Sequence, residues 1–294
     1  MARNIDKKIL ITDGCSWTAG DIVDPKLFAD DLKYSMHIDN DQYRLPRVWP
    51  HKLGNLLNIK VDNISNAGSS NDGIIRRTLS HIPAVLEKHK PEDITVIIGF
   101  TSPERKDFFF SDGEQENHWD TLYPSELGTF HLKQKDKKQF YNLYGRYYWN
   151  EQEYLSRYMI SIITLHSYLK ANNIKHYFFD AFYEPRDACL NPDVHAVFES
   201  ISLNKALKFK YKDWIDKKIT FKKLHIRGLY ETYFKIYDEV FIKKTMIEKM
   251  KEYLTEDQIK DHDSRMKVFD ETYHPTEFSH TVWAEYLFNN IKNV

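Results

Sequence analysis

Cysteine is almost absent from this chain, which has only Cys15 and Cys189 among its 294 residues. Two thiols do not form the disulfide framework of a small secreted domain, and no Cys/His cluster has zinc-ligand spacing. We therefore expect a protein without a metal that folds in a reducing compartment. The N-terminal segment lacks the apolar stretch of a signal peptide, which predicts synthesis in the cytoplasm without one.

Glycine and proline are also scarce, at 10 residues each, which excludes collagen-like and low-complexity sequence. Apolar runs such as Val96–Ile98 are far shorter than the ~20 residues of a membrane span, so no span is expected. Charge of one sign is not in excess. The 42 Lys and Arg balance 43 Asp and Glu, and the net charge of −1 requires no polyanionic partner.

Apolar and aromatic side chains, by contrast, are abundant. Hydrophobic residues make up 41% of the chain and aromatic residues 15%, which excludes a wholly disordered protein and predicts a substantial core. Short apolar runs alternate with helical periodicity, which predicts an α/β fold with a parallel sheet and helices on both faces. The expected strands are Lys8–Thr12, Ile59–Ile64, Asp93–Phe100 and Lys175–Asp180, and the expected helices are Asn71–Lys88, Gln152–Asn172 and Thr276–Asn289.

Two stretches depart from this alternation and are interpreted as insertions into a single domain that spans residues 1–294. The first, about 102–150, is rich in aromatic residues, and the second, about 190–255, is rich in Lys, Tyr and Phe. Lys205–Lys251 interleaves Lys with apolar residues, which favours amphipathic helices with a solvated Lys face. The chain contains no recognised RNA or DNA module, so a nucleic-acid partner is not expected.

The turn after the first strand carries Ser16, in Asp13–Gly20. Ligands of parallel α/β sheets bind where strands end and helices begin, and a Ser hydroxyl there lies near backbone N–H groups that can hold an oxyanion. The alternative is that Ser16 is only a helix N-cap.

Near the C-terminus, His274 follows Asp270 and Glu271. Either acid is close enough to fold back onto the ring Nδ1, as a general base requires, although a plain surface loop fits the same residues. A third loop, Asn66–Asp72, offers small residues that allow backbone N–H groups to approach a ligand, or it is an ordinary capped turn.

The segments GCSWTAG, NAGSSND, GFTSPER and ETYHPTEFSH together resemble the four blocks of the SGNH/GDSL hydrolase superfamily, in the family's order. The residues within these segments are similar to those of SGNH-like proteins encoded by tailed bacteriophages. The resemblance implies a three-layer, flavodoxin-like αβα sandwich and a serine esterase site without metal or cofactor. It implies Ser16 as nucleophile, His274 as general base, and Glu271 or, alternatively, Asp270 as the acid.

The same resemblance implies an oxyanion hole formed by the backbone N–H groups of Ser16 and Asn71 and by Thr101. Four positions depart from the family pattern. Cys15 replaces the Asp of GDS, Asn71 the oxyanion Gly, Thr101 the oxyanion Asn, and Glu271 the triad Asp. Losing one oxyanion donor costs about 10²–10³ in rate, so the Asn71 side chain is considered as a substitute donor. Cys15 is interpreted as a small buried thiol rather than a nucleophile.

The expected substrate-binding residues are Trp17, Gly68, Trp119, Tyr147 and Trp149. Flat aromatic rings suit a sugar, although such rings also fill cores and oligomer interfaces. The first hypothesis is therefore an esterase or deacetylase acting on an acylated carbohydrate or another small ester. The alternatives are a non-catalytic virion component that binds partner subunits or its own copies and, more weakly, a protein that modifies nucleic acid through Lys205–Lys251.

Overall fold

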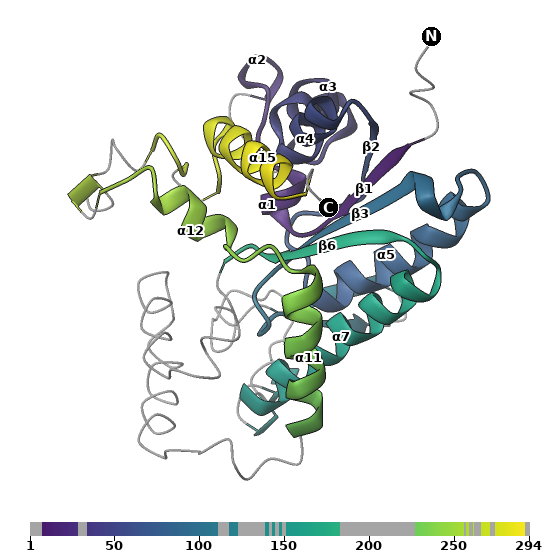
Figure 1. Cartoon of the computed structure of the whole chain (residues 1–294). Coiled ribbons are helices and arrows are strands. Elements are labelled where there is room, and N and C mark those ends of the chain that lie inside the picture. Colours follow the sequence, from purple (N-terminus) through teal and green to yellow (C-terminus); the bar gives the residue numbers. More distant parts are fainter. Residues whose placement is uncertain are drawn as a thin grey trace.

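The computed structural model describes residues 8–28, 34–110, 118–122, 139–140, 143–144, 147–148, 151–182, 227–255, 257–258, 261, 266–270 and 274–291. A parallel sheet lies at its centre, with the strand order β2-β1-β3-β6 and helices on both faces (Figure 1). The strands are β1 (Ile9–Asp13), β2 (Lys60–Asn63), β3 (Ile94–Phe100) and β6 (Lys175–Asp180). The predicted α/β fold with a central parallel sheet is confirmed, and each expected strand is present.

The apolar strands form because both faces of this sheet are buried. Along β3, the side chains of Val96 and Ile98 enter one hydrophobic cluster, and that of Ile97 enters the other. Phe178 and Phe179 divide in the same way along β6. Side chains alternate across a strand, so a strand covered on both faces is apolar throughout rather than at every second residue.

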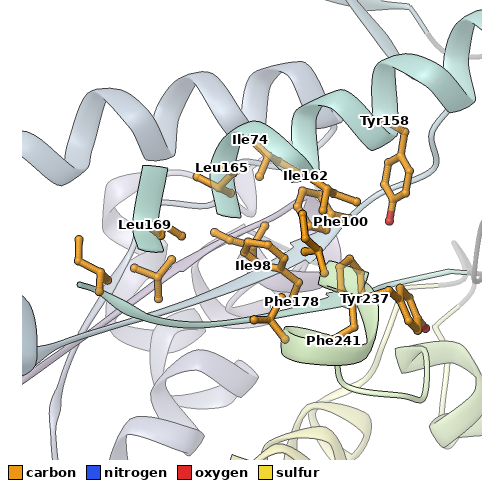
Figure 2. Close-up of a cluster of buried hydrophobic side chains, with 14 of the residues drawn as sticks. Ile74, Ile98, Phe100, Tyr158, Ile162, Leu165, Leu169, Phe178, Tyr237 and Phe241 are labelled. Atoms are coloured by element: carbon orange, nitrogen blue, oxygen red, sulfur yellow. The ribbon is translucent and has the colours of Figure 1, made fainter. Parts of the chain in front are cut away.

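One face is covered by α5 (Asn71–Leu86), α7 (Glu151–Ala171) and α11 (Arg227–Val240). Figure 2 shows the core beneath them, where Leu165 and Leu169 of α7 and Phe241 at the end of α11 meet Phe178 of the sheet. The rings of Tyr237 and Phe241 are stacked with centroids 4.4 Å apart. The apolar residues that face this core recur at helical spacing, which is why α5 and α7 were predictable.

The opposite face is covered by α1 (Ser16–Ala19), α4 (Trp49–Leu57), α12 (Met246–Lys251) and α15 (Glu277–Ile291), as Figure 1 shows. Trp49 and Trp283, from α4 and α15, are fully buried and pack edge-on against Phe179. Between α1 and α4 lie the short helices α2 (Pro25–Phe28), η2 (Ile38–Asn40), α3 (Asp41–Arg44) and η3 (Leu45–Arg47), and η4 (Pro91–Asp93) precedes β3.

The two expected insertions are described only in part. Within 102–150, an antiparallel hairpin pairs β4 (Lys106–Phe110) with β5 (His118–Leu122). Within 190–255, α11 and α12 belong to the two helical layers, while Lys205 lies outside the described residues. Among the described residues, no helix is both long and apolar enough to cross a membrane.

Candidate active site

Three loops meet at the carboxyl edge of the sheet because β1, β2 and β3 run parallel and end together. The loop after β2 is tied to the one after β1: the N–H of Ile64 donates to the carbonyl of Thr12 (3.0 Å), and that of Asn66 to Gly14 (3.3 Å). Ser16, Asn71 and Thr101 come from these three loops. Polar groups at such an edge are the usual place for a ligand in an α/β sheet.

Ser16 is the first residue of α1, a helix of a single turn. Its Oγ lies 2.9 Å from Nε2 of His274, 258 residues further along the chain. Cys15, not Ser16, is the N-cap, and it makes no side-chain capping bond. The alternative of Ser16 as a simple cap is therefore wrong. The Cys15 thiol is free and fully buried in the hydrophobic cluster under α4 and α15.

His274 is held in place by hydrogen bonds to Asp270. The N–H of Asp270 donates to the carbonyl of His274, and the N–H of His274 donates to Oδ1 of Asp270, both over 2.9 Å. The hydroxyl of Ser279, near the start of α15, donates to the carbonyl of Val268 (2.6 Å). These bonds fix the backbone on both sides of the imidazole.

The two expected acids differ in what the structure describes. Oδ1 of Asp270 accepts the backbone N–H of His274, so this carboxylate shapes the turn. Glu271 lies outside the described residues. An acid that sequence reasoning missed, Asp21, has its Oδ2 3.3 Å from Nε2 of His274. Its position directly after the GCSWTAG segment is the one signal that pointed to it.

The side chain of Asn71 and the backbone of Thr101 are joined by two hydrogen bonds. Nδ2 of Asn71 donates to the carbonyl of Thr101, and the N–H of Thr101 donates to Oδ1 of Asn71, both over 2.9 Å. The Asn71 side chain thus joins α5 to the end of β3, with one of its two N–H donors already used by the Thr101 carbonyl. Its backbone N–H is the first of α5, behind the N-cap Ser70, and has no acceptor within the helix. The buried hydroxyl of Thr101 has no hydrogen-bond partner among the described residues.

An ion pair between the fully buried Asp13 and the partly exposed Arg77 was also missed from the sequence. Nη2 of Arg77 donates to Oδ1 of Asp13 (2.6 Å), and Thr78 Oγ1 donates to Oδ2 (3.0 Å). Arg77 also reaches the carbonyl of Gly14 and the hydroxyl of Ser69, so one side chain joins the loops after β1 and β2. Burial raises the pKa of Asp13 to about 6, against the opposing effect of Arg77.

The expected substrate-binding residues are dispersed. Trp17 is only 4% exposed and packs between Phe182 and Phe269; a ring enclosed in this way cannot stack on a sugar, so this prediction is wrong. Gly68 takes a φ of 75° in the loop after β2, a conformation that favours glycine.

Of the predicted aromatic platform, Trp119 lies on β5 of the β4–β5 hairpin. The ring of Trp119 is half exposed over α5, where the guanidinium of Arg76 lies 3.9 Å from its centroid. Tyr147 is 65% exposed, and Trp149 lies outside the described residues. Among the His, Cys, Asp and Glu residues that the structure describes, no group of three or more is arranged to hold a metal ion.

A family model described as a family of unknown function (DUF6071) matches residues 30–219. No curated protein matches the chain in sequence.

Solved structures similar to this chain include a member of the lipolytic protein G-D-S-L family from Veillonella parvula DSM 2008 (12% identity, 98% of this chain and 100% of that chain, TM-score 0.44). Another is the psychrotrophic esterase EstA from Pseudoalteromonas sp. (10% identity, 98% of each chain, TM-score 0.42). A third is a carbohydrate esterase family 2 enzyme from Corynascus thermopiles (Myceliophthora fergusii) (9% identity, 98% of this chain and 66% of that chain, TM-score 0.41). Likenesses of this size do not establish a shared activity.

Proposed function

The chain belongs to the DUF6071 family of unknown function, and we propose that it is an SGNH-type serine esterase or deacetylase. One observation carries the proposal: Oγ of Ser16 lies 2.9 Å from Nε2 of His274. A serine hydroxyl at that distance from an imidazole, at the start of a helix, is the pair that nucleophilic acyl transfer requires.

In the acylation half-reaction, Oγ of Ser16 attacks the ester carbonyl carbon while its proton passes to Nε2 of His274. The carbonyl oxygen becomes an oxyanion, which the N–H groups of Ser16 and Asn71 and the hydroxyl of Thr101 stabilise. The bond to the leaving alcohol then breaks, and His274 returns the proton to the alcohol oxygen. Water repeats the sequence on the acyl-serine and releases the acid. Glu271 or Asp270 orients the imidazole.

The buried contacts around Ser16 support a site that is built rather than accidental. The Asp13–Arg77 pair holds the turn before Ser16, and the two hydrogen bonds between Asn71 and Thr101 hold the donors opposite. Such contacts reduce the cost of organising the site when charge develops, which is the main source of oxyanion-hole catalysis.

For the substrate, we propose an acylated carbohydrate. The support is the half-exposed ring of Trp119 and the exposed ring of Tyr147, since flat apolar faces of sugars stack on such rings. A set of acetylated mono- and oligosaccharides tests this part separately. A preference for aryl acetates over every sugar ester would contradict it and would leave the esterase proposal intact.

Two variants test the chemistry. Ser16→Ala should lower kcat for a short-chain aryl acetate by about 10⁴-fold or more, because it removes the nucleophile. Ser167→Ala, on the exposed side of α7, is the matched control and should leave the rate unchanged. A fluorophosphonate probe should label wild type at Ser16 and leave Ser16→Ala unlabelled. A wild-type protein that neither turns over esters nor reacts with the probe would favour the non-catalytic alternative.

A further inference from the structure

The carboxylate of Asp21 lies close to the same imidazole nitrogen of His274 that contacts Ser16. Oδ2 of Asp21 lies 3.3 Å from Nε2 of His274, and Oγ of Ser16 lies 2.9 Å from the same atom. Asp270 and Glu271, the acids expected from the sequence, precede His274 by four and three residues. We propose that Asp21 is a positioning residue that stabilises the imidazolium form of His274 through its Nε2–H group; this inference rests on the proposed esterase function.

The backbone before Asp21 is shaped to bring it back to the site. The one-turn helix α1 ends at Gly20, whose φ is 82° and whose N–H donates to the carbonyl of Ser16 (2.7 Å). A Cβ on Gly20 would lie 2.0 Å from Cγ1 of Val48. Only glycine satisfies both the positive φ and this close approach, so the chain reverses there and returns Asp21 toward Ser16.

Two buried polar residues then fasten the loop on both sides of Asp21. Arg44 donates to the carbonyl of Ala19. The amide of Asn40 donates to the carbonyl of Ile22 (2.7 Å), and its Oδ1 accepts the N–H of Asp24 (2.8 Å). Both side chains are buried. Buried polar groups carry a desolvation cost unless they are paired, and here the pairing fixes where one carboxylate stands.

Among the described residues, three other sets of titratable or charged groups lie on the elements around the imidazole. His280 of α15 is fully buried, and burial lowers its pKa to about 3, so it stays neutral. The carboxylate of Asp270 accepts the backbone N–H of His274. Lys52 of α4 is bound to Glu277 of α15 (3.2 Å). Among the residues that the structure describes, Asp21 is therefore the one whose carboxylate lies within salt-bridge distance of Nε2 of His274.

The position of Asp21 fits one step of the reaction. While Nε2 accepts the hydroxyl proton of Ser16, it is no donor to Asp21. Once the proton has moved, Nε2–H carries a positive charge, and a carboxylate at 3.3 Å stabilises it. This distance exceeds the ordinary length of a charge-assisted hydrogen bond, so the proton remains available for the leaving alcohol.

The test replaces this carboxylate by a neutral side chain of the same shape. Asp21→Asn should lower kcat for an aryl acetate by about tenfold with KM unchanged, since the lost contact is made to the protonated ring. The acid limb of its pH–rate profile should move to lower pH, because protonation of His274 loses a favourable charge. Asp24→Asn removes one negative charge from the same loop and should change neither. Asp21→Glu should recover part of the rate.

An NMR titration of the His274 ring provides a readout that needs no substrate. A shift to lower pH in Asp21→Asn, absent in Asp24→Asn, supports the proposal. If that shift appears while wild type neither turns over esters nor reacts with a fluorophosphonate, the esterase function fails and the contact stands. Identical titrations and identical rates in Asp21→Asn and Asp24→Asn would overturn the role of Asp21.

Discussion

The carboxyl edge of the sheet and the helical layers on its faces bury polar groups in opposite ways. At the edge, a charge is kept and paired between elements, as with Asp13 at the end of β1 and Arg77 of α5, which are 64 residues apart. Within the layers, the buried polar groups include a pair of imidazoles that need no charge. His166 of α7 faces His176 of β6, with Nδ1 of the first 3.0 Å from Nε2 of the second.

The two regions follow from what each must do. In His176, Nδ1 lies 2.8 Å from the carbonyl of Ile174 and must donate to it, so Nε2 is the acceptor for His166. This arrangement needs no charge, and burial lowers the pKa of both rings. At the edge, a charge has to be held where acyl transfer would develop one. Buried charge thus marks the proposed site, and buried neutral histidine marks the framework.

Removing the Arg77 cation at the edge of the sheet should have the largest effect on this difference between the two regions. Arg77→Ala leaves the fully buried Asp13 carboxylate without its ion partner, and we expect a loss of about 4 kcal/mol in the free energy of unfolding. Urea unfolding measures it. Asp13→Asn in the same background should restore part of the loss, since it removes the stranded charge. Equal stability of Arg77→Ala and wild type would show that the ion pair does not contribute to the free energy of unfolding.

A smaller effect is expected from removing the contact between α5 and the end of β3. Asn71→Ala removes both partners of the Thr101 backbone, and two buried groups left unpaired should cost about 3 kcal/mol. Hydrolysis should fall as well, because the donors lose their support. Asn71→Asp keeps the acceptor oxygen but places a buried carboxylate oxygen against the Thr101 carbonyl, so it should destabilise at least as much as Asn71→Ala. A loss of activity without a loss of stability would contradict this structural role of Asn71 and favour a direct contact with substrate.

The bounds of the expected strands and helices were predictable to within a residue or two because their signal is local, whereas α4 and the β4–β5 hairpin were not predicted. The run Lys175–Asp180 is a strand in both the prediction and the structure, and the apolar spacing in Asn71–Lys88 marks α5. Apolar period reports which faces a segment buries, and here the strands β1, β3 and β6 are buried on both faces. The segments that carry Ser16 and His274 were visible for a different reason, as short motifs in a recognisable order.

The rest of the site depends on pairings that no local pattern shows. Trp17 follows the serine and suggests a substrate contact, yet the direction of a one-turn helix sends it into the core. Asn71 has the chemistry of an oxyanion donor, yet its side chain binds the backbone N–H and carbonyl of Thr101, just after β3. Asp21 and Arg77 look like ordinary charged residues. Their roles depend on which loops converge, a property of the sheet topology.

The last prediction sharpens the contrast from the side of the neutral histidines. His280 is fully buried, with Nδ1 3.3 Å from the backbone N–H of Trp49, and burial lowers its pKa from 6.5 to about 3. Between these values the unfolded chain binds a proton that the folded chain does not, so stability falls as the pH falls. From pH 6.5 to 5 this group should remove about 2 kcal/mol.

His280→Asn isolates that contribution, because its Oδ1 keeps an acceptor for Trp49 and does not titrate. Wild type should lose about 2 kcal/mol more than His280→Asn between pH 6.5 and 5 in urea unfolding at each pH. Asp13 acts with the opposite sign: its raised pKa of about 6 means that the folded chain takes up a proton in this window and gains stability. That gain is common to both proteins and cancels in their difference. Parallel pH dependences would show that His280 is charged inside the fold and that the helical layers do hold charge.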